Sequence, residues 1–279
     1  MLDALRAVVS SMGSVLVCYS GGIDSALVLA VAHGVLGARA VAMTAVSPSL
    51  ALHELDGAKA FAVELGVRHE LIASGELDDP SYQANLADRC FHCKSELYRL
   101  AERYRQQWDL AYVANGTNVD DLGDFRPGLQ AAEEARVRSP LVEIGAKKAD
   151  VRRLAEALGL SIWDKPAAAC LSSRLPFGTR VTQERLARIG AFEGDLQSLG
   201  LRQQRVRWHS VGGDTSEASL ARIEVGQGEL TRAFELREAI VAVGKKHGFQ
   251  YVTLDLQGYR VGSHNEVLTG RTLRVLQGQ

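Results

Sequence analysis

The chain has 279 residues, of which 46% are hydrophobic and 23% are charged, and its formal net charge is -1. This length allows one large or two medium domains, and the balanced charge excludes nucleic acid as the default partner. Four cysteines are too few for a disulfide scaffold of this size. Since no apolar run reaches transmembrane length and the N-terminus lacks a signal-peptide pattern, we expect a cytoplasmic protein with no membrane partner.

Apolar runs alternate with helical patterns through the first half of the chain. The predicted strands cover residues 15–19, 39–46, 67–72 and 110–114. The predicted helices cover residues 2–11, 26–32, 51–65, 93–106 and 148–158. This alternation predicts βαβ units with a parallel sheet, in which ligands bind at the carboxyl ends of the strands.

The run Asp164-Lys165-Pro166 interrupts this pattern and marks a predicted domain boundary. We therefore expect a domain over residues 1–165 and a smaller α+β domain over residues 166–279. In the second domain Thr182 is predicted to be the N-cap of a helix that ends near Leu199. Its other predicted elements are strands at 204–209, 221–225 and 251–256 and a helix at 232–246.

A glycine pair lies on the turn between the first predicted strand and the following helix. Glycines let backbone N–H groups approach an anion without Cβ interference, and the N-terminus of the helix adds unpaired donors and partial positive charge. Serine hydroxyls can donate as well, and an aspartate can hold a magnesium ion that bridges phosphate oxygens. The sequence thus predicts a phosphate-binding loop made by Ser20, Gly21, Gly22, Asp24 and Ser25. It lacks the lysine of the GxxxxGK[ST] motif, and a tight turn without a ligand is the alternative.

The fourth predicted strand runs into a polar segment, residues 115–128, that is rich in turn residues. Because this segment also follows the carboxyl end of a strand, we expect it to face the glycine loop. A solvated connector is the alternative.

Cys170 lies in a segment that does not have the composition of a core, between two prolines and close to Lys165, Arg174 and Arg180. Nearby cations lower the pKa of a thiol and make its thiolate a strong nucleophile, whereas a buried structural cysteine would be inert. Cys90 and Cys93 form a Cys-x-x-Cys pair, which is typical of redox, metal or cluster sites. A closed zinc site is not expected, since the chain has no second pair. Cys18, inside the first strand, is predicted to be in the core.

Five segments together resemble one family. They are residues 20–25, 89–94, 116–128, 164–174, and the pair 205–207 and 221–225. The first is similar to the SGGxDS loop of the PP-loop ATP pyrophosphatases. All five together resemble LarE, the ATP-dependent sulfur transferase family of nickel-pincer cofactor synthesis. The resemblance covers nearly the whole chain and implies a Rossmann-like PP-loop domain followed by a smaller α+β domain.

The resemblance implies the following chemistry. ATP, with Mg²⁺, adenylates a carboxylate of a pyridinium-3,5-dicarboxylate mononucleotide and releases pyrophosphate. Sulfur from Cys170 then attacks the acyl-adenylate, and cleavage of the Cβ–S bond leaves a thiocarboxylate product and dehydroalanine. In some related sulfur transferases a Cys-x-x-Cys pair and a third cysteine instead hold a [4Fe–4S] cluster that carries the sulfide. Cys90, Cys93 and Cys170 would form that set here, and the two routes remain alternatives.

Arg205 and Arg207 alternate along a predicted strand, so both point to one face, and a guanidinium offers two parallel donors to phosphate. The resemblance implies that they bind the substrate phosphate, with Glu193 and Glu224 near a metal ion. A solvated strand face with salt bridges is the alternative. We also expect a homo-oligomer whose partners are other enzymes of nickel-pincer cofactor synthesis.

Three other functions fit the glycine loop. A tRNA-thiolating PP-loop enzyme would need a basic surface, against which the near-neutral charge argues. An adenylating amide ligase of the NAD synthetase type would not need Cys170. A nucleotide-binding regulator would show no exchange between ATP and pyrophosphate.

Overall fold

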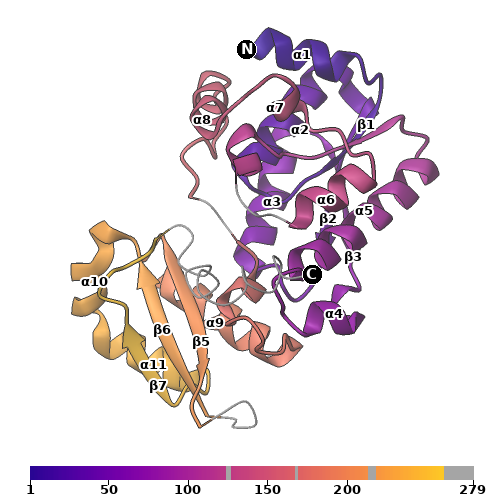
Figure 1. The fold of residues 1–279 in the computed structure, drawn as a ribbon. Helices are drawn as coiled ribbons and strands as arrows, with labels where there is room; N and C mark the ends of the chain where they lie inside the picture. Colours follow the sequence, from indigo (N-terminus) through magenta and orange to yellow (C-terminus); the bar gives the residue numbers. More distant parts are fainter. Residues whose placement is uncertain (124–126, 167–168, 213–217, 261–279) are drawn as a thin grey trace. The chain divides into compact units, whose positions relative to one another are not determined.

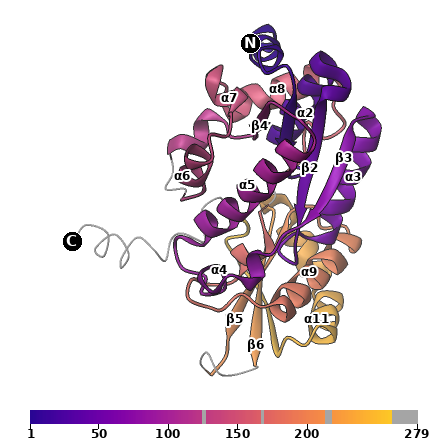
Figure 2. The ribbon, with the colours of Figure 1, turned by 90° about the vertical axis from the view of Figure 1, so that its right-hand side faces the viewer.

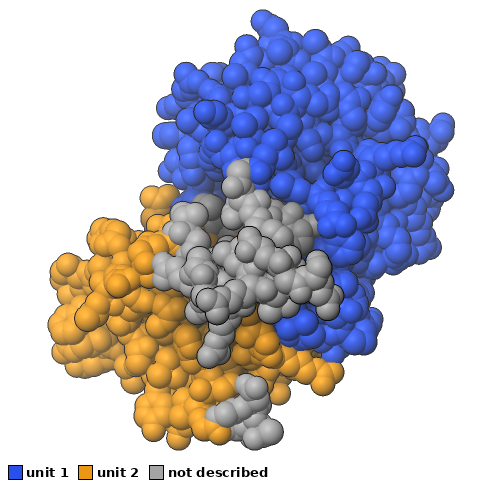
Figure 3. All heavy atoms as spheres, viewed as in Figure 1, with its two compact units in different colours: residues 1–168 blue, residues 169–279 orange. Residues whose placement is uncertain are grey.

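The computed structural model describes residues 1–279 apart from 124–126, 167–168, 213–217 and 261–279. The chain forms two compact units, Met1–Ala168 and Ala169–Gln279, coloured blue and orange in Figure 3. Among the described residues, none of the helices combines the length and the apolar character that a membrane crossing requires.

Unit 1 is built on a four-stranded parallel sheet with the strand order β3-β2-β1-β4. The strands are β1 (Val15–Cys18), β2 (Ala40–Val46), β3 (Arg68–Ala73) and β4 (Tyr112–Ala114). Strand β1 lies inside the sheet, and all four of its residues are buried. The predicted parallel α/β fold is therefore confirmed, and the turn after β1 lies where ligands of such sheets bind.

The two faces of this sheet are covered by different helices. Side chains alternate across a strand, so Val15 and Val17 pack into one hydrophobic cluster and Leu16 and Cys18 into another. The helices are α1 (Leu2–Ser10), α2 (Ile23–Leu36), α3 (Leu52–Leu65), α4 (Pro80–Gln83), α5 (Arg89–Gln107), α6 (Pro127–Glu134), α7 (Pro140–Glu143) and α8 (Lys148–Ala157). Helices α1, α2, α3 and α8 contribute to the first cluster, and α5 and α6 to the second, which gives three layers (Figures 1 and 2).

Two helices begin earlier than the sequence predicted. Helix α2 begins at Ile23 rather than Ala26, because Gly22 is extended and serves as its N-cap, so that Asp24 and Ser25 are helical residues. Helix α5 begins at Arg89 rather than Cys93, and the Cys-x-x-Cys pair is thus part of a helix. A C-cap glycine in the left-handed conformation, Gly66 with φ 67°, ends α3 as predicted.

Unit 2 contains a three-stranded sheet with the order β5-β6-β7. The short 3₁₀ helix η4 (Leu171–Arg174) precedes α9 (Gln183–Ser198), whose first turn is capped by Thr182 at 3.2 Å from the Arg185 N–H. The remaining elements are β5 (Gln204–Ser210), β6 (Ser219–Val225), α10 (Leu230–Glu235), α11 (Arg237–Lys246) and β7 (Tyr251–Leu254). The predicted helix at 232–246 is wrong in one respect, since it is divided at Leu236 into α10 and α11.

The core of unit 2 lies between its helices and its sheet. Phe249 packs against Phe192 of α9, with ring centroids 5.6 Å apart, and against Trp208 of β5, at 5.3 Å. Strands β5 and β6 are antiparallel, whereas β6 and β7 are parallel. This mixed sheet with helices is the smaller α+β domain that the sequence predicted.

Two helical glycines of unit 2 test this packing. A Cβ at Gly244 would lie 2.4 Å from Val252 Cγ2 and 3.0 Å from the Phe192 ring, whereas a Cβ at Gly194 would meet no atom within 4 Å. We expect Gly244→Ala to destabilise the protein by about 1–3 kcal/mol through overpacking. Gly194→Ala should stabilise it by up to about 1 kcal/mol, because alanine is the better helix former. Urea unfolding measures both, and effects of the same sign would contradict the close packing of α11.

Candidate active site

The predicted phosphate loop lies at the carboxyl end of β1 and leads into α2. Ser25 Oγ donates to the Gly22 carbonyl at 3.0 Å and accepts from the Ser20 N–H at 3.2 Å. The two serine hydroxyls lie 3.1 Å apart. The loop is therefore fixed by its own serines, at a helix N-terminus suited to binding an anion.

The two glycines of the loop have different structural roles. Gly21 has φ 75°, and a Cβ there would lie 3.0 Å from Ala58 Cβ and 3.3 Å from the Glu54 carbonyl. Gly22 has a negative φ, and a Cβ there would meet only Ser20 Oγ, at 3.4 Å. The fold itself thus requires glycine at position 21. At position 22 the requirement for glycine remains a prediction that depends on a bound phosphate.

The first residues after β4, Gly116 and Asn118, lie against the glycine loop, as their position in the sheet predicted. A Cβ on Gly116 would lie 2.4 Å from the Ser25 backbone nitrogen, so only glycine permits this approach. Asn118 Nδ2 donates to Asp24 Oδ1 at 3.2 Å. Arg126, which belongs to the segment that resembles the family, is outside the described residues.

Asp24 is the residue of this loop that fits a magnesium ion. Its side chain is 23% exposed and lies in the first turn of α2. Oδ1 accepts from Asn118, and Oδ2 lies 2.5 Å from Lys148 Nζ. One accessible carboxylate beside a phosphate loop is a common protein contribution to a magnesium site, where water and phosphate oxygens complete the coordination.

Glu54 of α3 connects the glycine loop to Lys165, a contact that sequence reasoning missed. Lys165 Nζ lies 2.7 Å from Glu54 Oε2 and donates to the Gly21 carbonyl at 2.9 Å. His53 Nε2 lies 3.5 Å from Glu54 Oε1. Burial alone would raise the pKa of Glu54, but the hydrogen bonds and charges of His53 and Lys165 lower it to about 2. Lys165, which the sequence places among the cations near Cys170, thus contacts the glycine loop within unit 1.

In unit 2, Cys170 is the N-cap residue of η4, and it is exposed. Its carbonyl accepts hydrogen bonds from the Ser173 N–H at 3.0 Å, from Ser173 Oγ at 2.7 Å and from Arg174 Nη1 at 3.0 Å. The main chain of Cys170 is thus fixed while its side chain is open to solvent. This arrangement fits a reacting thiol better than a structural one.

Arg174 is fixed in turn by α9. Its Nε and Nη2 donate to the two carboxylate oxygens of Glu193 at 2.8 and 2.9 Å, and both side chains are at most 3% exposed. Glu193 Oε1 also accepts from the Val206 N–H at 2.8 Å. Burial alone would lower the pKa of Arg174, but the Glu193 carboxylate raises it. This bidentate pair joins η4, α9 and β5.

Arg205 and Arg207 lie on the same face of β5 and are buried, at 8% and 7% exposure. Arg207 donates to Glu224 Oε2 at 2.8 Å and to the Ser173 carbonyl at 2.9 Å. Burial and the neighbouring charge of Arg174 lower the pKa of Arg205. This group of charged side chains includes Arg174, Arg205, Arg207, Arg222, Glu193, Glu224 and Asp255. Arginines gathered in this way suit an anionic ligand.

Glu193 and Glu224 do not fit a magnesium site in this arrangement. Glu193 accepts from Arg174 with both oxygens, and the two oxygens of Glu224 pair with Arg207 and Arg222. Within the described part of the chain, no three His, Cys, Asp or Glu side chains come together so that they could hold a metal ion. We therefore assign the two glutamates to holding arginines and derive no metal chemistry from them.

The remaining cysteines lie in unit 1 and differ in exposure. Cys90 is exposed and Cys93 is half-buried, both near the start of α5. Cys18 is buried, as predicted, and burial raises the pKa of its thiol to about 12. This environment disfavours the thiolate, as expected for a cysteine of the core.

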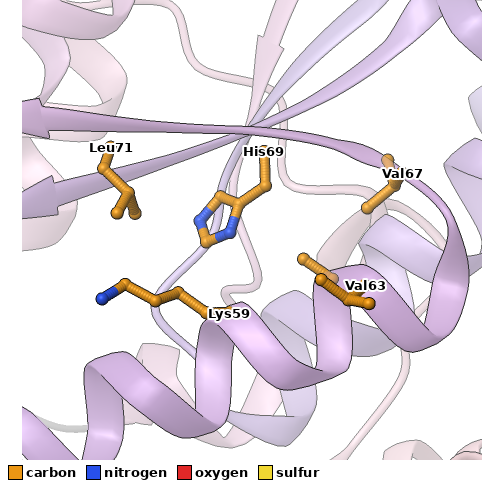
Figure 4. A pocket seen from close by; sticks show the side chains of 6 residues that line it. Lys59, Val63, Val67, His69 and Leu71 are labelled. Atoms are coloured by element: carbon orange, nitrogen blue, oxygen red, sulfur yellow. The ribbon is translucent and has the colours of Figure 1, made fainter.

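Two hollows lie apart from the predicted phosphate-loop residues. One, of about 270 Å³, lies between α3 and β3, and Figure 4 shows Lys59, Val63, Val67, His69 and Leu71 around it. The other, of about 450 Å³, is lined by residues that include Glu76, His92, Glu96 and Arg99. No residue predicted for ATP, sulfur or substrate lines either hollow.

Comparison with known proteins identifies similar chains. No protein-family model matches this one. Pyridinium-3,5-bisthiocarboxylic acid mononucleotide synthase of Lactiplantibacillus plantarum is 37% identical over 266 residues, which cover 95% of this chain and 94% of that protein. An uncharacterized protein of Synechocystis is 46% identical over 271 residues, covering 96% and 98%. An uncharacterized protein of Methanocaldococcus jannaschii is 27% identical over 246 residues, covering 88% and 90%.

The low pKa of Glu54 makes stability depend on pH. The ionised carboxylate stabilises the folded chain fully above its ordinary pKa of 4.5, and this contribution is lost as the pH falls from 4.5 to about 2. At neutral pH we expect it to be about 3 kcal/mol. Glu54→Gln should therefore lower the free energy of unfolding at pH 7 more than at pH 3, measured by urea unfolding. Glu238→Gln, at a side chain that is 89% exposed, is the control. An equal loss at both pH values would contradict the ion pair.

Proposed function

The chain belongs to the LarE family of ATP-dependent sulfur transferases, and from this membership we propose that it converts a carboxylate of pyridinium-3,5-dicarboxylate mononucleotide into a thiocarboxylate. The observation that carries the proposal is the similarity to a pyridinium-3,5-bisthiocarboxylic acid mononucleotide synthase along 95% of the chain. The product serves nickel-pincer cofactor synthesis.

ATP activates the carboxylate at the glycine loop of unit 1. A carboxylate is a poor electrophile, and its attack on the α-phosphate of ATP gives an acyl-adenylate with pyrophosphate as the leaving group. Ser20, Gly21, Gly22 and Ser25 bind the pyrophosphate part through backbone N–H groups and hydroxyls. Asp24 would hold Mg²⁺, which neutralises phosphate charge when it is bound.

Cys170 supplies the sulfur in the sacrificial route. Its thiolate attacks the acyl carbon, AMP leaves, and a thioester joins the substrate to the protein. Loss of the Cα proton of Cys170 and cleavage of its Cβ–S bond then release the thiocarboxylate and leave dehydroalanine. The exposed side chain on a fixed main chain supports this role, since the thiol is accessible and its position is set by Ser173 and Arg174.

Arg205 and Arg207 bind the phosphate of the mononucleotide. Their burial on one face of β5, close to the charge of Arg174, supports this assignment, because a guanidinium offers two parallel donors to a phosphate. Glu193 and Glu224 orient the arginines. The functional division into an ATP domain, residues 1–165, and a sulfur-transfer and substrate domain, residues 166–279, follows from these roles.

Cys90 and Cys93 offer a second source of sulfur. With Cys170 they would provide the three thiolate ligands of a [4Fe–4S] cluster that carries a sulfide. Cys90 and Cys93 belong to unit 1 and Cys170 to unit 2, so this route needs ligands from both units. A cytoplasmic homo-oligomer that hands its product to other enzymes of the cofactor's synthesis completes the proposal.

The Cys170→Ala variant tests the proposed function. It should form no thiocarboxylate but should still exchange pyrophosphate with ATP when the dicarboxylate substrate is present, since activation needs no sulfur. In the sacrificial route the wild-type chain loses the mass of one H₂S in its single turnover, with dehydroalanine at position 170, and Cys90→Ala and Cys93→Ala stay active. In the cluster route anaerobically prepared protein contains about four irons per chain, and both variants are inactive. Product formation by Cys170→Ala at the wild-type rate would contradict both routes.

A further inference from the structure

Two lysines far from the glycine loop in sequence reach it in space. The loop motif itself contains no lysine, unlike the GxxxxGK[ST] motif, in which a lysine contacts the terminal phosphates. Lys148, the first residue of α8, and Lys165 each place an ammonium group against the loop. Both belong to unit 1, as does the loop.

Lys148 is held by the carboxylate at the start of α2. Its Nζ lies 2.5 Å from Asp24 Oδ2, and its own N–H donates to Asp120 Oδ2 at 2.8 Å. The Lys148 side chain is 34% exposed. The main chain of this lysine is thus fixed by the segment after β4, while the flexible side chain ends at the entrance to the phosphate loop.

Lys165 approaches the loop from the side of α3. Its Nζ contacts both Glu54 Oε2, at 2.7 Å, and the Gly21 carbonyl, at 2.9 Å, and its side chain is 21% exposed. Arg152 Nη2 donates to the Lys165 carbonyl at 3.1 Å and fixes its main chain. The ammonium group therefore lies next to the glycine whose backbone conformation shapes the loop.

The charge of the ligand gives these lysines a function. A triphosphate carries more negative charge than one magnesium ion neutralises, and the leaving pyrophosphate keeps most of it. The lysine ammonium group is a compact charge at the end of a flexible side chain, so it can move with a phosphate group. We propose that Lys148 and Lys165 bind the pyrophosphate part of ATP and stabilise it as the leaving group, while Asp24 and Glu54 hold them in the absence of nucleotide. This inference rests on the proposed use of ATP by the same loop.

The pair of Lys148 and Asp24 has a further consequence. Asp24, the residue that would hold Mg²⁺, is the carboxylate that Lys148 contacts. Transfer of the ammonium group from this carboxylate to a bound phosphate would therefore leave the carboxylate available to the ion.

Comparison of two nucleotides tests the proposal. Isothermal titration calorimetry with Mg²⁺ should show that Lys148→Met and Lys165→Met weaken binding of α,β-methylene-ATP at least about tenfold each, as expected for a charge-assisted contact. AMP, which lacks the pyrophosphate, should bind within about twofold of wild type. Lys148→Arg and Lys165→Arg should recover most of the lost affinity. Lys59→Met, on α3 next to Asp56, is the matched control and should bind both nucleotides like wild type.

Equal weakening for AMP and for the ATP analogue, or no weakening for either, would overturn the assignment. A second measurement needs no variant: α,β-methylene-ATP with Mg²⁺, but not AMP, should change the acetylation rates of Lys148 and Lys165 in the wild-type chain, read by mass spectrometry. Unchanged rates would also overturn it.

The two proposals can fail separately. The proposed function alone would be contradicted if the lysine variants weaken binding of the ATP analogue but not of AMP, and the wild-type protein makes no thiocarboxylate. An active enzyme whose lysine variants bind both nucleotides normally would contradict the lysine assignment alone. Wild-type protein that binds neither nucleotide would overturn both.

Discussion

Both candidate anion sites depend on the same interaction, a carboxylate that holds a cation where an anion is expected to bind. In unit 1, Asp24 holds Lys148 and Glu54 holds Lys165. In unit 2 the pairs are Arg174 with Glu193 and Arg207 with Glu224. The attraction within the two buried pairs of unit 2 is largely offset by the cost of removing both charges from water, so these two pairs add little net stability. All four pairs keep positive charge in position before the ligand arrives.

The pair of Arg174 and Glu193 also sets the position of Cys170. Because Glu193 occupies Nε and Nη2, the remaining Nη1 of Arg174 is directed to the carbonyls of Ala169 and Cys170, at 2.7 and 3.0 Å. Removal of either partner would leave an unpaired buried charge, which typically costs about 3–5 kcal/mol. Cys170 is therefore exposed on a segment whose conformation is set by a buried contact.

The fold was predictable because β1, β2 and β4 are short apolar runs that alternate with helical patterns. The glycine loop was predictable because its motif is contiguous. The starts of α2 and α5 were not predictable from the apolar pattern. Each helix begins within a motif, and the polar residues of that motif occupy its first turn. Lys148 and Lys165 carried no local signal either, since they meet the loop across 124 and 144 positions of sequence. The roles of Glu193 and Glu224 needed the partners that only the folded chain brings together. The functional assignments of Arg205, Arg207 and the cysteines stay predictions.

The central claim is that ATP activates a carboxylate which sulfur then attacks, and the fate of one oxygen tests it most directly. Pyridinium-3,5-dicarboxylate mononucleotide labelled with ¹⁸O in its carboxylates is incubated with ATP and the wild-type protein, and the AMP is analysed by mass spectrometry. An acyl-adenylate intermediate predicts one ¹⁸O atom in AMP for each thiocarboxylate formed, because the bridging oxygen leaves with the phosphate. Unlabelled AMP beside a labelled thiocarboxylate product, or label in pyrophosphate, would contradict the account.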